Sequence, residues 1–153
     1  MNAKMVDISR KPEIYRAATA TGKILLKADT IKRIRLGQVE KGNPLQIATV
    51  AGINASKLTS QLMPLCHPLR IEGTDITTKI NNSSITVTAT VNAFDRTGVE
   101  MEALTVVTIT LLNIWDVTKQ YEKTNDGQYP STSISGIKVV EKVKRNVVIS
   151  RGT

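Results

Sequence analysis

Asp116 and Lys119 are the residues whose types and spacing point most directly to proton transfer. They stand three positions apart in the segment 115–119, so on a helix they would lie on one face within reach of each other. The segment before them is apolar, and a carboxylate beside a lysine that is partly removed from water is a candidate for general acid–base chemistry. An ordinary surface ion pair is the alternative interpretation.

The single histidine and the single cysteine are neighbours in the segment Leu65-Cys66-His67-Pro68-Leu69. Pro68 favours extended backbone angles at His67, so we expect a rigid, non-helical loop of the kind that often carries functional side chains. A packed or solvent-facing histidine is the alternative. Adjacent residues of an extended chain point to opposite sides, so catalysis by a Cys66–His67 pair is not expected, and Cys66 is predicted to be a small buried residue.

Two carboxylates, Glu100 and Glu102, stand where a long helix is expected to begin. Acidic residues in a first turn are stabilised by the positive end of the helix, which is the alternative to a functional role. On this helix Glu102 and Asp116 would share roughly one face but lie about 21 Å apart along the axis. One chain therefore cannot bring them together, and only a second subunit could complete a site that uses both.

Composition narrows the classes of protein and of site. The chain has 153 residues, 21 Lys and Arg against 13 Asp and Glu, a net charge of +8, and one cysteine. One cysteine excludes an intramolecular disulfide, a multi-cysteine zinc site and a single-chain iron–sulfur cluster. The positive charge favours a polyanionic partner, which nucleic acid, an anionic surface or a phosphorylated small molecule could supply.

Several common signals are missing from the sequence. It contains no phosphate-binding P-loop, no dinucleotide fingerprint and no zinc spacing, so no metal ligands are predicted. We see no apolar run long enough for a membrane span and no secretory signal, so we expect a cytoplasmic protein without a membrane partner.

The candidate residues are distributed over predicted strands, helices and loops. Residues 1–22 are expected to form an extended or mobile arm, and residues 23–153 a single catalytic domain. The predicted strands cover residues 23–27, 70–80, 83–94 and 137–144, and the predicted helices cover 29–40, 44–62 and 99–123. This order predicts an α+β fold, an antiparallel sheet with helices packed on one face.

Some expectations concern backbone detail. Gly42 is predicted to end the first helix, and Asn43 to cap the second. The Asn81-Asn82 link of the hairpin is expected to use left-handed backbone angles. Strict alternation in the last strand would place Ile137, Val139, Glu141 and Val143 on one face, and Lys138, Val140, Lys142 and Lys144 on the other.

Taken together, these segments resemble the cyclic pyranopterin monophosphate synthase family, protein C of molybdenum cofactor biosynthesis. The matching motifs are MVDIS at 5–9, KG at 41–42, AGINASK at 51–57, PLCHPL at 64–69, TGVEMEAL at 97–104 and DVTK at 116–119. They occur in the family's order over residues 5–145. The resemblance implies a ferredoxin-like fold and a homohexamer, a trimer of dimers with active sites at the dimer interface.

The resemblance also implies an activity. Family members convert (8S)-3′,8-cyclo-7,8-dihydroguanosine 5′-triphosphate to cyclic pyranopterin monophosphate and release pyrophosphate. By this resemblance the catalytic candidates are Asp116, Lys119, Lys41 and His67, and the substrate-binding candidates are Leu65, Cys66, His67, Lys57, Glu100, Met101, Glu102, Arg16 and Lys138. No cofactor is expected, and whether Mg²⁺ accompanies the triphosphate stays open.

One segment departs from the family pattern. Many members carry Lys-Ser-Gly-Gly-Lys before the last strand, whereas residues 133–138 read SISGIK here and keep one glycine and one lysine. We therefore expect this segment to contact the triphosphate differently from the same segment in those members.

Two other functions are weighed against the synthase. A basic nucleic-acid-binding module would need aromatic stacking platforms, and of the five aromatic residues (one Trp, three Tyr, one Phe) only Phe94 lies in a predicted strand. A non-catalytic nucleotide-binding oligomer would bind the substrate without turning it over.

Overall fold

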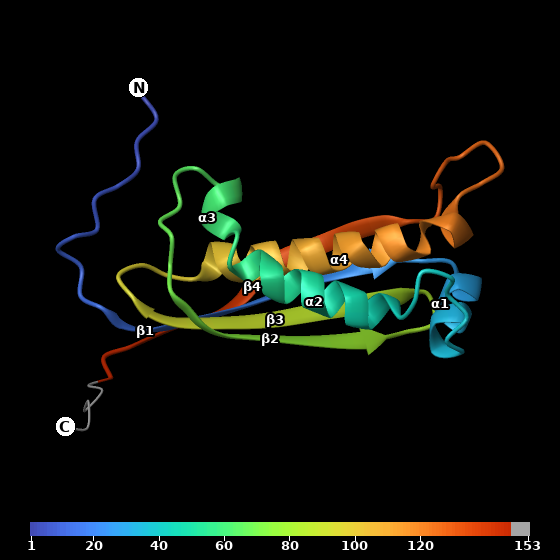
Figure 1. Cartoon of the computed structure of the whole chain (residues 1–153), viewed down its shortest axis with the longest axis horizontal. Coiled ribbons are helices and arrows are strands. Elements are labelled where there is room, and N and C mark those ends of the chain that lie inside the picture. Colours follow the sequence, from blue (N-terminus) through green and yellow to red (C-terminus); the bar gives the residue numbers. More distant parts are fainter. Residues whose placement is uncertain (148–153) are drawn as a thin grey trace.

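The protein is built on one four-stranded antiparallel sheet with its helices on one face (Figure 1). The computed structural model describes residues 1–147. The elements are β1 (Ile14–Leu25), α1 (Ala28–Arg35), α2 (Pro44–Ser56), α3 (Thr59–Leu62), β2 (Ile71–Ile80), β3 (Ser84–Asp95), α4 (Glu100–Glu122) and β4 (Ser133–Arg145). The strand order β2-β3-β1-β4 with this sequence of elements is the ferredoxin-like arrangement, as predicted.

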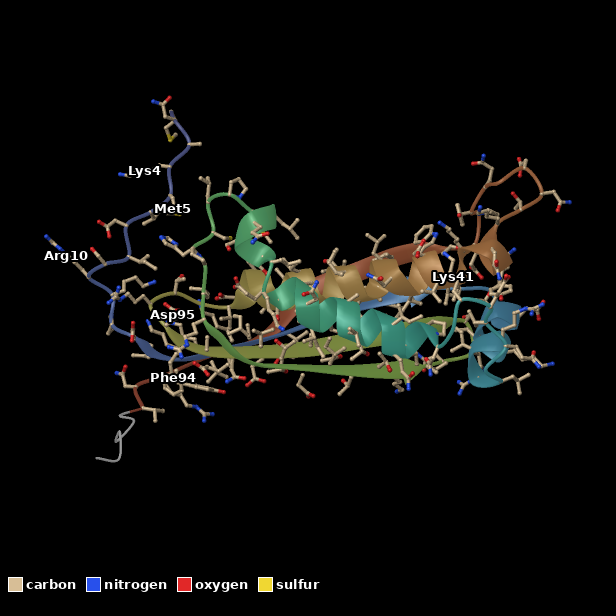
Figure 2. The ribbon with its side chains drawn as sticks, in the orientation of Figure 1. Lys4, Met5, Arg10, Lys41, Phe94 and Asp95 are labelled. Carbon is tan, nitrogen blue, oxygen red and sulfur yellow. The ribbon has the colours of Figure 1, made fainter. Side chains whose placement is uncertain are left out.

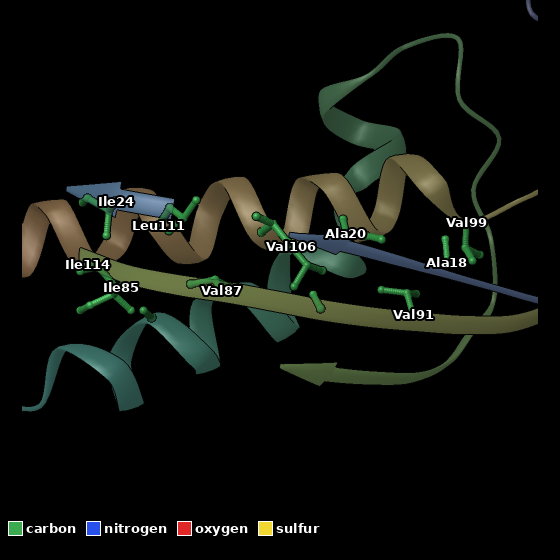
Figure 3. Packing of buried hydrophobic residues seen from close by; sticks show 14 of the residues in the cluster. Ala18, Ala20, Ile24, Ile85, Val87, Val91, Val99, Val106, Leu111 and Ile114 are labelled. Carbon is green, nitrogen blue, oxygen red and sulfur yellow. The ribbon is translucent and has the colours of Figure 1, made fainter. Parts of the chain in front are cut away.

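The core lies between the sheet and the two long helices α2 and α4 (Figure 3). Alternate residues of β1 and β3 face the helices, and the register pairs Ala20 with Ala89 and Ile24 with Ile85. The centre of β1 carries small residues on this face. A Cβ atom at Gly22 would come within 2.9 Å of Leu111 in α4, so the glycine lets the helix approach the sheet closely.

Helix α4 spans 23 residues and is long and apolar enough to cross a membrane by length and composition. More than half of its most apolar window is buried inside the protein, where Val106, Val107, Leu111 and Ile114 belong to the core. The core helix of a soluble protein meets the same criterion. Its packing against the sheet and α2 accounts for this composition.

Strand β1 begins earlier than predicted. Residues 14–22, expected as part of the arm, form the central strand between β3 and β4, so the arm shortens to residues 1–13. The run Ala17-Ala18-Thr19-Ala20 is poor in the bulky residues that signal a strand, and pairing with two neighbours fixes it instead. Residues 148–153 of the predicted domain lie outside the described residues.

The first helix is shorter than predicted. It ends at Arg35, and Gly37 with φ of 66° provides the left-handed residue that follows. Gly42, predicted to end the helix, has φ of 118° in the loop that follows. The segment between these two glycines is therefore a loop, and it carries Lys41.

The second helix begins as predicted and ends early. Asn43 accepts hydrogen bonds from the backbone N–H groups of Leu45 and Gln46 at 3.0 and 3.2 Å. The helix stops at Ser56, where Lys57 is the C-terminal cap, and α3 forms a separate short turn.

The last strand does not alternate strictly, because its pairing with β1 shifts. Thr19 lies opposite Glu141 while Ala20 lies opposite Val139, so Val140 is an additional, bulged residue. The predicted faces are therefore wrong beyond this point: Glu141 and Val143 lie on the face away from the helices, and Lys142, opposite Ala18, lies on the helix face. The bulge sends Lys142 toward the beginning of α4.

The hairpin between β2 and β3 is confirmed, but its turn differs from the prediction. In the described part of the chain only glycines have positive φ, so Asn81 and Asn82 do not use left-handed angles. The turn closes instead through the Asn81 N–H, which donates to the Ser84 carbonyl at 2.8 Å.

Candidate active site

Asp116 and Lys119 lie near the C-terminal end of α4 and form the predicted ion pair. Lys119 Nζ is 3.0 Å from Asp116 Oδ1. Lys41, from the loop before α2, places its Nζ 3.5 Å from Asp116 Oδ2 and donates to the Asp116 backbone carbonyl at 3.1 Å. We call these three residues the Asp116 cluster.

The charges of the Asp116 cluster reinforce one another. The hydrogen bond from Lys119, then the charges of Lys119 and Lys41, lower the pKa of Asp116. In return the hydrogen bond to Asp116 raises the pKa of Lys119. The free chain therefore holds an anion between two cations, and both pKa shifts keep these groups ionised. Proton transfer by Asp116 or Lys119 requires a ligand to displace one of these contacts.

The predicted partial removal of water from Asp116 is wrong for the single chain. The Asp116 side chain is 56% exposed, and those of Lys41 and Lys119 are 44% and 42% exposed. Proton transfer that depends on excluding water therefore needs a ligand or another subunit over this cluster.

A second group of predicted residues lies at the opposite end of the molecule. An open cavity of about 420 Å³, here called the N-terminal pocket, is lined by Leu65, Cys66, His67, Glu100 and Met101 and by Lys4, Asp7 and Lys11 of the arm. Figure 2 shows Lys4, Met5 and Arg10 at this end and Lys41 at the other. The chain therefore contains two separate groups, as the spacing of Glu102 and Asp116 predicted.

Glu102 lies in the first turn of α4 and is only 4% exposed. Burial, reinforced by the negative charges of Glu100 and Asp95, raises the pKa of Glu102 to about 7. Within residues 1–147 no lysine or arginine forms an ion pair with it. Near neutral pH this carboxyl can therefore either donate or accept a hydrogen bond.

Glu100, two residues before Glu102 in the same first turn, has a different electrostatic environment. Lys142 Nζ lies 2.5 Å from Glu100 Oε1. Burial opposes ionisation, but the hydrogen bond from Lys142 and the charges of Lys142 and Arg16 lower the pKa of Glu100 overall. The pKa values of the two neighbouring carboxyls are thus shifted in opposite directions. Such a difference is typical of sites that need both an acid and a base.

Cys66 and His67 line the pocket without pairing for catalysis. Cys66 is half-buried rather than fully buried. Burial, helped by the charge of Glu102, raises the pKa of the Cys66 thiol, so a thiolate nucleophile is not favoured. A hydrogen bond from Ser9 lowers the pKa of Asp7, and the charge of His67 adds to this effect. Asp7 of the arm is therefore the charged neighbour of His67.

The remaining substrate-binding candidates lie in three different places. Arg16 is buried and donates to the backbone carbonyls of Asp95 and Arg96 at 2.9 and 3.3 Å, which holds the loop before α4. Lys57 lines a neighbouring hollow of about 330 Å³. Lys138 lies opposite Thr21, on the sheet face away from the helices, so the single chain does not bring it to either group.

Sequence reasoning missed several residues around these groups. Lys142 was hidden because alternation assumes a regular strand, and the bulge is visible only once β1 and β4 are paired. Lys4, Asp7 and Lys11 belong to or flank the MVDIS motif, which marked the arm without assigning its side chains to the pocket. No cluster of three or more His, Cys, Asp or Glu that could hold a metal ion occurs in the described part of the chain.

Comparison with known proteins settles the family. Residues 5–144 of the chain match the MoaC family. This chain belongs to the MoaC family.

Curated relatives extend the MoaC match over nearly the whole chain. A protein of Saccharolobus solfataricus named "probable cyclic pyranopterin monophosphate synthase" is 54% identical over 93% of this chain and 95% of its own length. Proteins of the same name from Pyrococcus abyssi and Sulfolobus acidocaldarius are 52% and 51% identical, each over 92% of this chain and over 89% and 98% of their own lengths.

Proposed function

We propose that this MoaC-family chain is a cyclic pyranopterin monophosphate synthase of molybdenum cofactor biosynthesis, a lyase. It converts (8S)-3′,8-cyclo-7,8-dihydroguanosine 5′-triphosphate to cyclic pyranopterin monophosphate and pyrophosphate. The observation that carries the proposal is the Asp116 cluster, in which two lysines from separate segments meet one carboxylate. The family match and the names of the relatives support the same activity.

The Asp116 cluster suits the chemistry of this conversion. Opening the imidazole ring and rebuilding it as a pterin requires protons to move, and Asp116 and Lys119 already share a hydrogen bond. Forming the cyclic phosphate expels pyrophosphate, and the ammonium groups of Lys41 and Lys119 stabilise the developing negative charge. We propose no resident cofactor; a Mg²⁺ ion on the triphosphate would enter with the substrate.

The N-terminal pocket suits recognition of the guanine-derived base. Glu100 in the pocket wall, and Glu102 two residues further along α4, offer carboxyl oxygens that accept hydrogen bonds from an amino group and a ring N–H. Leu65, Cys66 and Met101 supply an apolar wall, and His67 a further polar group. Recognition of the base by carboxyls that are buried or partly buried discriminates strongly against analogues that lack these donors.

The two groups act together only across a subunit interface. They lie at opposite ends of α4, about 21 Å apart, and the Asp116 cluster is open to solvent. We therefore propose a homohexamer, a trimer of dimers, in which the Asp116 cluster of one subunit faces the N-terminal pocket of its partner. The proposed setting is the cytoplasm, with no nucleic acid or membrane partner.

Turnover of the cyclised GTP substrate tests the activity directly. Pyrophosphate and pterin product are followed together for the wild-type protein, Lys119→Ala, Asp116→Asn and, as a control, Lys32→Ala on the outer face of α1. We expect product from the wild type and the control, and none from the two cluster variants. Tight binding of the substrate without product would indicate a nucleotide-binding oligomer. Absence of both binding and product would favour the nucleic-acid-binding module.

Mixing inactive variants tests the shared site. Asp116→Asn and Glu102→Gln subunits are unfolded together and refolded as mixed oligomers. If each site draws on two chains, random mixing restores about a quarter of the wild-type activity, because a mixed dimer has one intact site of two. No recovery in oligomers shown to be mixed would place both groups' functions within one chain.

A further inference from the structure

The loop that carries Lys41 is fastened to the last turns of α4 by residues outside the family motifs. The Glu40 backbone N–H donates to the Tyr121 hydroxyl oxygen at 2.9 Å. Gln120 Nε2 donates to Glu40 Oε2 at 3.2 Å. The guanidinium group of Arg33 lies over the Tyr121 ring, 4.7 Å from its centroid, and orients the ring from the side of α1.

These contacts act on the residue directly before Lys41. Consecutive Cα atoms are only about 3.8 Å apart, so holding the Glu40 amide also limits where the Lys41 backbone can lie. The loop has a glycine on either side, Gly37 and Gly42, both at positive φ. Glycine has access to more backbone conformations than other residues. Buried Val39, whose carbonyl accepts from the Gly42 N–H at 3.1 Å, fixes part of this segment, and the Tyr121 contact adds an anchor at the residue next to Lys41.

Lys41 needs such an anchor because its long side chain must meet a particular atom. Its Nζ contacts both the carboxylate and the backbone carbonyl of Asp116. The side chain is half exposed, so packing alone does not hold it there. Tyr121 lies in α4, five residues after Asp116. Its hydrogen bond with the Glu40 amide therefore fixes the loop relative to the helix that carries Asp116.

We infer that Tyr121, assisted by Gln120, is a positioning residue that presents Lys41 to Asp116. This inference rests on the proposed function of the Asp116 cluster. Tyr121 touches no reacting group itself; its hydroxyl accepts the Glu40 amide, and Lys41 acts on the substrate. A phenylalanine in its place would keep the ring under Arg33 and remove only the acceptor.

The test compares Tyr121→Phe with Tyr15→Phe. Tyr15 is a matched control because its ring packs against Phe94 at the other end of the sheet, far from Lys41. Three quantities are measured: hydrogen exchange at the Glu40 amide, the acetylation rate of Lys41 relative to Lys32, and kcat and KM. The first two report the loop directly and need no substrate.

In Tyr121→Phe we expect about fivefold faster exchange at Glu40, the ratio that corresponds to losing one exposed hydrogen bond. Lys41 should become more reactive toward acetylation because it leaves Asp116 more often. We expect kcat to fall about fivefold with KM within twofold of wild type, since the loss concerns the transition state rather than binding of the substrate. Tyr15→Phe should leave all three quantities unchanged.

Two results would overturn the inference. Exchange and acetylation equal to wild type in Tyr121→Phe would show that Tyr121 does not hold the loop. An unchanged kcat in Tyr121→Phe, beside an inactive Lys41→Ala, would show that the anchor does not serve catalysis while the synthase proposal stands. An inactive wild type would instead refute the proposed function, and exchange and acetylation would still decide whether Tyr121 holds Lys41.

Discussion

Glu102 and Glu122 are two buried carboxylates at opposite ends of α4, and their surroundings differ sharply. Glu122 is completely buried and accepts hydrogen bonds from the Lys27 backbone N–H at 3.1 Å, from the Thr30 hydroxyl, and from the Thr132 hydroxyl at 2.6 Å. Glu102 is nearly as buried, but the charges that act on its pKa, those of Glu100 and Asp95, are negative. Burial alone therefore does not separate a structural from a functional carboxylate.

The two carboxylates differ in how many of their oxygen lone pairs already accept hydrogen bonds. The acceptors of Glu122 are occupied by three segments, the entry to α1, α1 itself and the beginning of β4, which it ties to the end of α4. Glu102 has a pKa of about 7 and follows Met101, which lines the N-terminal pocket, so its proton remains exchangeable near neutral pH. Glu122 therefore stabilises the fold, whereas we propose that Glu102 binds the substrate.

Removing Glu122 should have the largest effect on stability. In Glu122→Ala the Lys27 amide and two threonine hydroxyls lose their acceptor in a buried place, so the free energy of unfolding should fall by about 4 kcal/mol. Chemical denaturation measures this, with the exposed Glu141→Ala as control. A loss of stability no larger than that of the control would show that Glu122 does not stabilise the fold.

The pH dependence of stability should reveal Glu102. Its pKa is about 7 in the folded chain and 4.5 in the unfolded chain. The folded state therefore binds the proton more tightly, so this group's contribution is fully present below pH 4.5 and is lost as pH rises to about 7, by up to about 3 kcal/mol.

Unfolding free energies at pH 5 and pH 8 test this expectation. The wild type should lose stability between the two values, and Glu102→Gln should lose markedly less because its amide does not ionise. Equal pH dependence in both proteins would mean that Glu102 does not titrate in this range.

Glu102→Gln should also separate activity from stability. We expect kcat/KM to fall about 100-fold, because the amide replaces one carboxyl oxygen with an NH2 group and can neither ionise nor transfer a proton, while stability at pH 8 does not fall. Glu122→Gln should show the opposite, a less stable protein whose folded fraction keeps most of its turnover. Steady-state kinetics on the folded fraction measure the activity of each variant, and chemical denaturation measures its stability. Similar activity and stability changes in the two variants would contradict the division of roles.

The smallest effect is expected from Lys142, which distinguishes Glu100 from Glu102. In Lys142→Met the pKa of Glu100 should rise, because its ion-pair partner is gone. Stability should change by less than about 1 kcal/mol, since the pair is partly exposed. Carboxyl titration by NMR checks the pKa, with Lys144→Met as control; an unmoved Glu100 pKa would argue against the assigned contact.

Local patterns in the sequence predicted much of this protein. The spacing of Asp116 and Lys119 predicted their ion pair, Asn43 predicted its cap, and the apolar run of α4 predicted a buried helix. Interactions between residues a few positions apart follow from helix geometry alone, which is why these predictions are confirmed. The family motifs predicted the ferredoxin-like sheet.

The misses involve pairing between distant segments. The small residues of β1 become a central strand only because β3 and β4 flank them, and the bulge at Val140 exists only relative to β1. The contact of Lys41 with Asp116 joins residues 75 positions apart across a glycine-bordered loop. No short-range rule places such residues, because their positions depend on how the whole sheet and its helices pack.

Local sequence patterns identified the residues that can do chemistry. They also showed that Glu102 and Asp116 cannot meet within one chain, because helix rise fixes their separation. Packing of distant segments placed Lys41 beside Asp116 and turned Lys142 toward Glu100. It also surrounded Glu122 with hydrogen-bond donors and Glu102 with negative charges. Charge, exposure and pKa depend on which distant segments cover a group, and that is a property of the folded chain.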